Sequence, residues 1–249
     1  MKPTILFAGA KTIGANCLKE VVKLHTAGTA ELIGVVRGQP RNTSLTTGQS
    51  VDDIAEQAAV PVYADWPTEA KPNFIVSVQY QSVLSAEQLA QAETSAVNLH
   101  LAPLPEYRGA NQFSYAILNG ETEFGVTLHE MVPRVDAGPV LGERRFAVAP
   151  ACVVSELYDT ACEEAVILFR ETLGPLLRGE LQPREQATDE PGVVTHFYRK
   201  KDIESEKRLD PSWSPEKIDR YVRAMDMPGY EPPFFEIDGR KIYLSLRWR

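Results

Sequence analysis

An asparagine and a histidine stand two positions apart where an apolar stretch of the sequence ends. Asn98 and His100 follow residues 94–97, a run typical of a β-strand. Successive side chains alternate between the two faces of a strand, so Asn98 and His100 are expected to point the same way. Pro103 and Pro105 keep the following backbone extended and prevent a helix from starting there. This stretch therefore predicts two polar side chains that enter one pocket together.

A carboxylate in a glycine-containing loop, Asp136, is the candidate partner of His100. A histidine oriented by a carboxylate can act as a general acid and base, and an asparagine amide can stabilise an oxyanion. No serine or cysteine lies beside these residues in an activated setting such as GxSxG, which favours direct transfer to an acceptor over a covalent enzyme intermediate. The alternative is a capped strand end with a hydrogen-bonded histidine and no catalytic role.

Motifs that bind metals or nucleotides are incomplete in this sequence. His129-Glu130 lacks the second histidine of HExxH, because position 133 is proline. We therefore expect no metal site and interpret His129 as an ordinary strand residue. Residues 9–14 (GAKTIG) match neither GxGxxG nor a Walker A loop, and we interpret them as a tight turn.

Apolar runs typical of buried strands alternate with stretches of helical pattern. Residues 4–9 (TILFAG) form a mostly apolar run ended by glycine, the pattern of a buried parallel strand. Further strands are predicted at residues 31–36, 61–63, 74–78, 97–99, 124–131 and 139–148, helices at 13–24, 51–59, 112–118, 155–178 and from Ser85, and a long loop at 37–50. The alternation predicts an α/β fold with a doubly wound, mainly parallel sheet. Ligands of such sheets bind at the carboxyl ends of the strands, where Asn98 and His100 lie.

The last quarter of the sequence differs from the rest in its pattern of residues. Residues 182–192 are polar and contain proline, which indicates a linker between a main domain at 1–181 and a small C-terminal α+β appendage at 192–249. Within the appendage, residues 196–198 are expected to be extended and Ser214-Pro215 to begin a helix. Asp238-Gly239 is the turn signal of a β-hairpin.

Composition narrows the class of partner. The chain has 249 residues and a net charge of -8, without a dense lysine and arginine stripe, so no nucleic acid partner is expected. No stretch approaches the about 18 apolar residues of a membrane span, and the amino terminus lacks the apolar region of a signal peptide. Three cysteines form no CxxC pair. These features predict a cytoplasmic protein with reduced thiols and no membrane partner.

Four motifs together resemble the N10-formyltetrahydrofolate-dependent formyltransferases. They are Asn98-x-His100 and residues 104–109 (LPEYRG), 125–129 (GVTLH) and 135–139 (VDAGP). The separation of Asn98 from Asp136 also fits this family, and the resemblance covers residues 1–180. One departure is the loop at 101–103 (LAP), which differs from the Ser-Leu-Leu-Pro type loop of many members. We expect this loop to line the pocket and to help determine the acceptor.

The resemblance implies a Rossmann-like catalytic domain, N10-formyltetrahydrofolate as co-substrate and no metal. An acceptor amine would attack the formyl carbon directly. Asn98 and protonated His100 would stabilise the oxyanion, His100 would also move protons between the amine and N10 of the folate, and Asp136 would orient His100. The folate cleft would be lined by Gln79, Tyr80, Gln81, Val83 and Leu84 after the 74–78 strand, and by Arg134.

Within the family, the sequence is most similar to sugar-nucleotide N-formyltransferases. These transfer the formyl group to the 4-amino or 3-amino group of deoxysugars linked to dTDP, UDP or GDP, for surface polysaccharides such as O-antigen. Arg108, Asn111 and Tyr230 would contact this acceptor, and the family resemblance implies a homodimer. Glycinamide ribonucleotide or methionyl-tRNA as acceptor, and a non-catalytic folate- or nucleotide-binding relic, are the alternatives.

Overall fold

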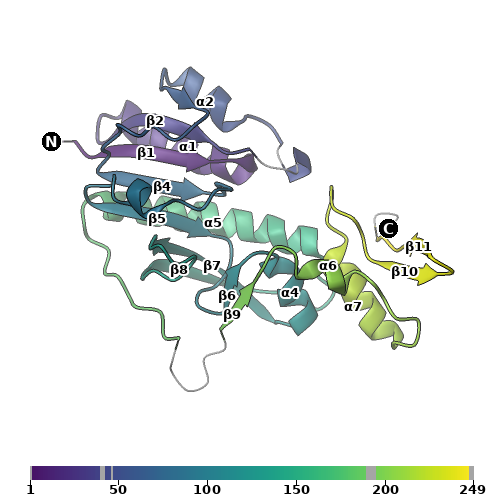
Figure 1. The fold of residues 1–249 in the computed structure, drawn as a ribbon. Helices are drawn as coiled ribbons and strands as arrows, with labels where there is room; N and C mark the ends of the chain where they lie inside the picture. Colours follow the sequence, from purple (N-terminus) through teal and green to yellow (C-terminus); the bar gives the residue numbers. More distant parts are fainter. Residues whose placement is uncertain (1, 40–42, 46, 189–194, 247–249) are drawn as a thin grey trace.

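The computed structural model describes residues 2–39, 43–45, 47–188 and 195–246, and its centre is a seven-stranded sheet (Figure 1). The strand order is β3-β2-β1-β4-β5-β7-β8. The strands are β1 (Thr4–Gly9), β2 (Glu31–Arg37), β3 (Val62–Tyr63), β4 (Phe74–Val78), β5 (Ser95–His100), β7 (Glu123–Glu130) and β8 (Val140–Ala147). β1 to β5 run parallel, whereas β7 is antiparallel to both β5 and β8. The predicted α/β fold with a mainly parallel sheet is confirmed.

The two faces of the sheet are covered unequally. Helices α1 (Lys11–Thr26), α2 (Val51–Gln57) and α5 (Val154–Leu177) contribute to the larger core, which also contains residues of β1, β4 and β5. The smaller core contains Leu6, Ile75 and Leu84, with the short helix α3 (Ala86–Leu89) and aromatic side chains packed against it. β1 and β4 are buried along almost their whole length, as their apolar sequences predict.

Serine side chains begin several of the helices. Ser50 and Ser85 each accept a hydrogen bond from the backbone N–H three residues ahead, which completes a capping box at α2 and at α3. Near β1, α1 begins at Lys11, earlier than the predicted residue 13, and Lys11 itself has a left-handed φ of 61°. In the predicted 37–50 loop, Thr43–Leu45 forms the short helix η1, while residues 40–42 and 46 lie outside the described residues.

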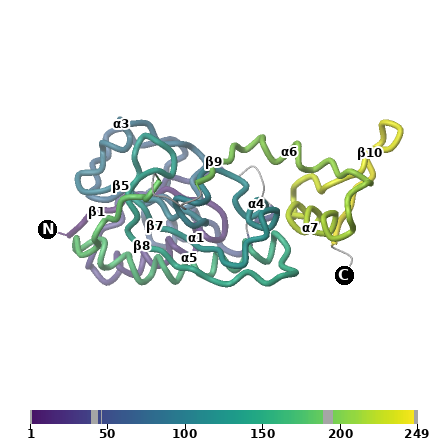
Figure 2. Tube along the Cα trace, turned by 90° about the horizontal axis from the view of Figure 1, so that it is seen from below, coloured from purple at the N-terminus to yellow at the C-terminus, as the bar shows by residue number. Residues whose placement is uncertain are grey.

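The C-terminal part of the chain contains β9 (His196–Tyr198), α6 (Ile203–Glu206), α7 (Pro215–Met225), β10 (Phe234–Ile237) and β11 (Arg240–Tyr243). Ser214 caps α7 and Pro215 is its first residue, as predicted. Asp238 and Gly239 both have positive φ, as a tight hairpin turn between β10 and β11 requires. α7 packs on α4 (Gln112–Asn119), and Figure 2 shows α7 and β10 at the end of the molecule opposite the amino terminus.

The segment that follows α5 does not leave the sheet as a free linker. Arg184 and Val140 exchange both backbone hydrogen bonds, of 2.7 and 2.8 Å, beside β8. Further on, β9 pairs in parallel with β6 (Tyr107–Gly109), the short strand that follows β5. Residues 189–194 of the predicted linker lie outside the described residues. The described residues on either side of them are thus bonded to β8 and to β6.

Candidate active site

Asn98 and His100 lie at the carboxyl end of β5, as predicted. β5 runs between β4 and β7, and Asn98 pairs with Ser77 on one side and with His129 on the other. His100 is the last residue of the strand and is only 6% exposed, whereas Asn98 is half-buried. The two polar side chains therefore lie at the carboxyl end of the parallel strands, where such sheets bind ligands.

Asp136 lies in the loop between β7 and β8 and turns its carboxylate toward the end of β5. Its Oδ1 is 3.8 Å from Nδ1 of His100 and 3.6 Å from Nε2 of His129. Its Oδ2 accepts a 2.9 Å hydrogen bond from the backbone N–H of Gly109. The three residues predicted to act together are thus neighbours in the structure.

Opposing effects act on the Asp136 carboxyl group. Burial alone raises its pKa, because water no longer stabilises the charge. The charge of His100 when its ring is protonated, the neighbouring His129 side chain and the N–H of Gly109 act in the opposite direction and prevail. The pKa of Asp136 is therefore held well below its ordinary value, and the group is a carboxylate at neutral pH.

His129 is a member of this cluster that sequence reasoning assigned only to a strand. Its Nδ1 lies 2.8 Å from the carbonyl oxygen of Glu130, which can only accept, so Nδ1 carries a proton. Its Nε2 then faces Nδ2 of Asn98 at 3.2 Å and the carboxylate of Asp136. A neutral His129 accepts a hydrogen bond from Asn98 and so fixes the direction of the amide. The available sequence signal was the place of His129 in the 125–129 motif, whereas its position opposite Asn98 follows from the antiparallel pairing of β7 with β5.

The backbone of β6 supports both catalytic candidates. Nε2 of His100 lies 2.8 Å from the carbonyl oxygen of Tyr107, so Nε2 is the protonated nitrogen in this orientation. Nδ1 is left facing Asp136, where a proton taken up by the ring would lie next to a carboxylate. Two residues further on, Gly109 donates its N–H to Asp136. A short strand therefore orients His100 and Asp136 at the same time.

The residues predicted to line a folate cleft differ in how far they are available to a ligand. They are Gln79, Tyr80, Gln81, Val83, Leu84 and Arg134. Val83 is 71% exposed, and Gln81 and Arg134 are also exposed. Leu84 is buried in the smaller core, and Tyr80 packs against Trp66. Gln79 has a left-handed φ of 55° and accepts a 2.8 Å hydrogen bond from Nζ of Lys11.

The three residues predicted to contact the acceptor occupy different settings. Arg108 is buried in β6, and its Nε and Nη2 donate to the side-chain oxygen of Gln186 at 3.2 and 2.6 Å. Asn111 precedes α4 and donates to the backbone carbonyls of Arg199 and Lys200. Tyr230 is 48% exposed in the loop between α7 and β10. Asn111 therefore joins the catalytic half of the chain to the C-terminal part.

The loop at 101–103 is closed to solvent, contrary to the expectation that it lines the pocket. Leu101 and Ala102 are fully buried, and the following Leu104-Pro105 peptide bond is cis. The hydroxyl of Thr127 donates to the carbonyl of Ala102 at 2.9 Å and accepts from the N–H of Leu104. Leu101 and Ala102 therefore pack inside the protein behind the end of β5 and present no surface to a ligand.

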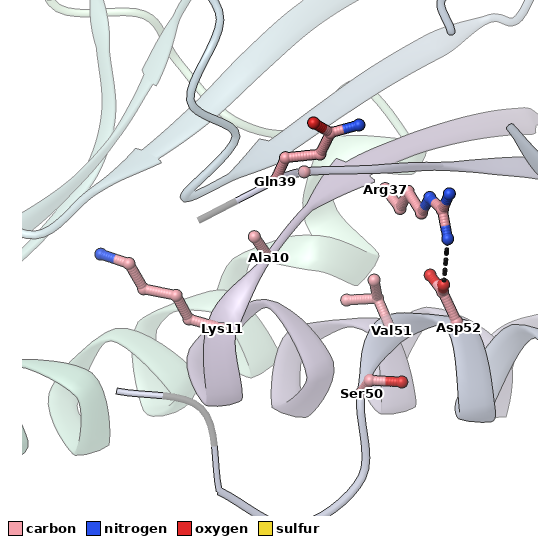
Figure 3. A pocket seen from close by; sticks show the side chains of 8 residues that line it. Ala10, Lys11, Arg37, Gln39, Ser50, Val51 and Asp52 are labelled. Carbon is pink, nitrogen blue, oxygen red and sulfur yellow. Dashed lines mark hydrogen bonds and ion pairs between the residues drawn. The ribbon is translucent and has the colours of Figure 1, made fainter. Parts of the chain in front are cut away.

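A cavity of about 270 Å³ lies at the carboxyl ends of β1 and β2, one of the positions where parallel sheets bind ligands (Figure 3). Lys11, Arg37, Ser50 and Asp52 contribute to its wall. Arg37 and Asp52 form a 3.1 Å ion pair, and Figure 3 shows the Lys11 side chain extending away from this pair. Burial lowers the pKa of Lys11, whose ammonium group reaches Gln79 beyond β4. The sequence analysis interpreted residues 9–14 as a tight turn and predicted no binding site at this cavity.

Comparison with known families finds that part of this chain is similar to formyl transferases. A model of the formyl transferase family matches residues 54–173, a range that contains Asn98, His100 and Asp136. The matched residues are therefore similar to formyl transferases. Two relatives are GDP-perosamine N-formyltransferases from Brucella melitensis biotype 1 and Brucella abortus, each 31% identical over 173 residues, or 70% of this chain. The matched part spans 64% of each relative, slightly less than two thirds of its length.

Solved structures share the fold of almost the whole chain. An N-formyltransferase from Helicobacter canadensis, in complex with folinic acid and dTDP-3-aminofucose, superposes with a TM-score of 0.78. The match has 20% sequence identity and covers 97% of this chain and 86% of that one. A 4-N formyltransferase from Francisella tularensis superposes with a TM-score of 0.76 at 16% identity, covering 98% of this chain and 97% of that one.

Two further observations concern only the part of the chain that the structure describes. No group of three or more histidine, cysteine, aspartate or glutamate side chains in it has the arrangement of a metal site. No helix within the same residues is long and apolar enough to span a membrane.

Proposed function

We propose that this chain transfers a formyl group from N10-formyltetrahydrofolate to the amine of a nucleotide-linked amino deoxysugar. The observation that carries the proposal is the convergence of Asn98, His100 and Asp136 at one strand end of a formyl transferase domain. The two Brucella relatives act on GDP-perosamine by name, which makes a GDP-linked amino sugar the first acceptor to test.

The folate would supply the formyl group, whose carbon bonds to the acceptor nitrogen while its bond to N10 breaks. The amide nitrogen of Asn98 has two N–H groups, one of which points to His129. Its second N–H is available to donate to the formyl oxygen as that oxygen gains negative charge. Asn98 would thus act on the oxygen while His129 fixes its orientation.

His100 would move the proton. The acceptor amine loses a proton as it is acylated, and N10 must gain one as it leaves. Nδ1 of His100 can take up the first and return the second, because Asp136 lies 3.8 Å away and stabilises the positive ring between the two transfers. The position of His100 at the end of β5 limits the movement of its ring between the two transfers.

The decisive experiment combines purified protein, N10-formyltetrahydrofolate and a panel of GDP-, dTDP- and UDP-linked 4-amino and 3-amino sugars. The proposal predicts release of tetrahydrofolate together with the mass gain of one formyl group on one of the sugars. His100→Ala should abolish turnover, whereas His25→Ala, on α1, should preserve it. Formylation of glycinamide ribonucleotide or methionyl-tRNA instead would refute the acceptor class, and no turnover with any amine would refute the transferase function.

We also propose the homodimer that the family resemblance implies. Ile237, Ile242 and Tyr243 are about half exposed on the β10–β11 hairpin, a concentration of apolar side chains that a partner subunit could cover. Light scattering should give the mass of a dimer, and Ile242→Lys should shift it toward the monomer. A monomeric wild-type protein would refute this assembly.

The remaining parts of the proposal concern organisation and biological setting. Residues 1–181 would form the catalytic domain and residues 192–249 a C-terminal subdomain that provides part of the acceptor wall. The enzyme would act in the cytoplasm, in the synthesis of surface polysaccharide such as O-antigen. Deletion of the coding sequence in its source organism should therefore remove N-formyl sugars from the surface polysaccharide, as detected by mass spectrometry.

A further inference from the structure

Gln186 links two parts of the candidate active site by its side chain. Its amide nitrogen donates to the carbonyl of Asp136 at 3.0 Å and to the carbonyl of Gly138 at 2.7 Å. Its amide oxygen accepts the two hydrogen bonds of Arg108. Both N–H groups and the oxygen of this one amide are therefore engaged, all with residues of the site.

The Asp136 loop has a conformation that needs such support. Asp136 has a φ of 50°, in the left-handed region that residues other than glycine seldom adopt. Gly138 lies against the backbone of Glu130, where an added Cβ would collide with the carbonyl oxygen. By binding the carbonyls of Asp136 and Gly138, Gln186 holds the loop from one side while Gly109 holds the carboxylate from the other.

Gln186 is itself held in place by the backbone. Arg184, two positions before it, exchanges both hydrogen bonds with Val140 at the start of β8. This fixes the segment after α5 against the same hairpin whose loop carries Asp136. The orientation of Gln186 thus follows from strand pairing as well as from its own side-chain contacts.

We propose that Gln186 is a positioning residue for formyl transfer, which holds the Asp136 loop so that the carboxylate faces His100 and His129, and which orients Arg108. This inference rests on the proposed function for its kinetic test. The side-chain hydrogen bonds of Gln186 are made with protein groups, namely Arg108 and the carbonyls of Asp136 and Gly138. Its effect on the reaction passes through the placement of Asp136.

Two substitutions separate the donor and acceptor roles of the amide. Gln186→Ala removes both roles. Gln186→Glu has nearly the same shape and still accepts from Arg108, but its carboxylate cannot donate to the carbonyls of Asp136 and Gly138. Gln182→Ala, in an exposed glutamine of the same segment, is the matched control and should behave as wild type.

In steady-state kinetics we expect both Gln186 variants to lose roughly tenfold to a hundredfold in kcat, with KM for the folate changed less than about threefold. Retention of wild-type kcat by Gln186→Ala would overturn the proposal. Wild-type kcat in Gln186→Glu alone would show that only the acceptor role toward Arg108 matters, which also overturns it. If wild-type protein formylates no amine, the proposed function is refuted and these kinetic measurements cannot be made.

A second readout does not depend on turnover. The backbone N–H of Gly109 donates to Asp136, so its hydrogen exchange, followed by NMR, reports whether the carboxylate is in place. Gln186→Glu should speed exchange at Gly109 at least about tenfold while the amides of β1 keep wild-type rates. Unchanged exchange at Gly109 would overturn the proposal whatever the enzyme's substrate is.

Discussion

Replacing Asp136 by asparagine tests the electrostatic core of the site. Asparagine keeps the size of the side chain and an oxygen that can accept from Gly109, but it removes the negative charge. That charge lies 3.8 Å from Nδ1 of His100, and two unit charges near 4 Å interact by about 4 kcal/mol at an effective dielectric constant of about 20. Since about 1.4 kcal/mol corresponds to a factor of ten in rate, Asp136→Asn should lower kcat by about 10³-fold.

The assay is release of tetrahydrofolate under saturating folate and amino sugar, which isolates kcat from binding. The free energy of unfolding, from denaturant titration, should fall by about 2 kcal/mol or less, because one charged hydrogen bond becomes a neutral one. Asp65→Asn, an exposed aspartate before Trp66, is the matched control and should leave both quantities unchanged. A kcat of Asp136→Asn within tenfold of wild type, in a folded protein, would refute the reasoning.

Three further predictions follow from the same geometry. The pKa of Asp136 is lower in the folded protein than the value of about 3.9 in an unfolded chain, so the stability that its carboxylate contributes is complete above pH 3.9 and is lost as pH falls below it. The melting temperature measured between pH 6 and 3 should therefore fall more steeply for wild type than for Asp136→Asn. Parallel falls in the two proteins would contradict this. Asn98→Ala should lower kcat by about 10²-fold to 10³-fold with KM nearly constant, and an effect confined to KM would assign Asn98 to binding instead. Gly109 has a φ of 88°, and an added Cβ would collide with the carbonyl oxygen of Tyr198, so Gly109→Ala should cost more than about 1 kcal/mol of stability and also lower kcat. Gly48→Ala, at a φ of 72° in open space, measures the cost of the backbone angle alone. Equal losses of stability in the two variants would exclude the collision.

The sequence was most informative where local chemistry decides the structure. The apolar run of residues 4–9 predicted a buried strand, because a strand inside a parallel sheet is covered on both faces and therefore needs apolar side chains on both. Ser214-Pro215 and Asp238-Gly239 predicted a helix start and a hairpin turn from backbone preferences alone. Asn98 and His100 were predicted as a pair from the period of a strand, Asp136 was predicted as the partner of His100 from its residue type and loop, and the family resemblance implied the same three residues.

What the sequence did not reveal depends on pairing between distant segments. His129 joins the site because β7 is antiparallel to β5 in a register that places it opposite Asn98, and a single sequence does not contain that register. Gln186 lies in a polar stretch with proline, which by composition indicates a linker, yet its neighbour Arg184 pairs with β8. Leu101 and Ala102 were expected at the pocket but are buried, because Thr127 holds their loop inward.

The pairing of β6 with β9 has a consequence for the order in which the enzyme becomes active during its synthesis. Asn98, His100 and Asp136 leave the ribosome well before Gln186 and His196, the residues that complete the support of the Asp136 loop and of β6. A nascent chain that ends near residue 181 can form the sheet, since every strand of it has already been made. It would nevertheless lack the contacts of Gln186 with the Asp136 loop and of β9 with β6, so under the proposed function the activity of the growing chain should begin only after β9 has been added.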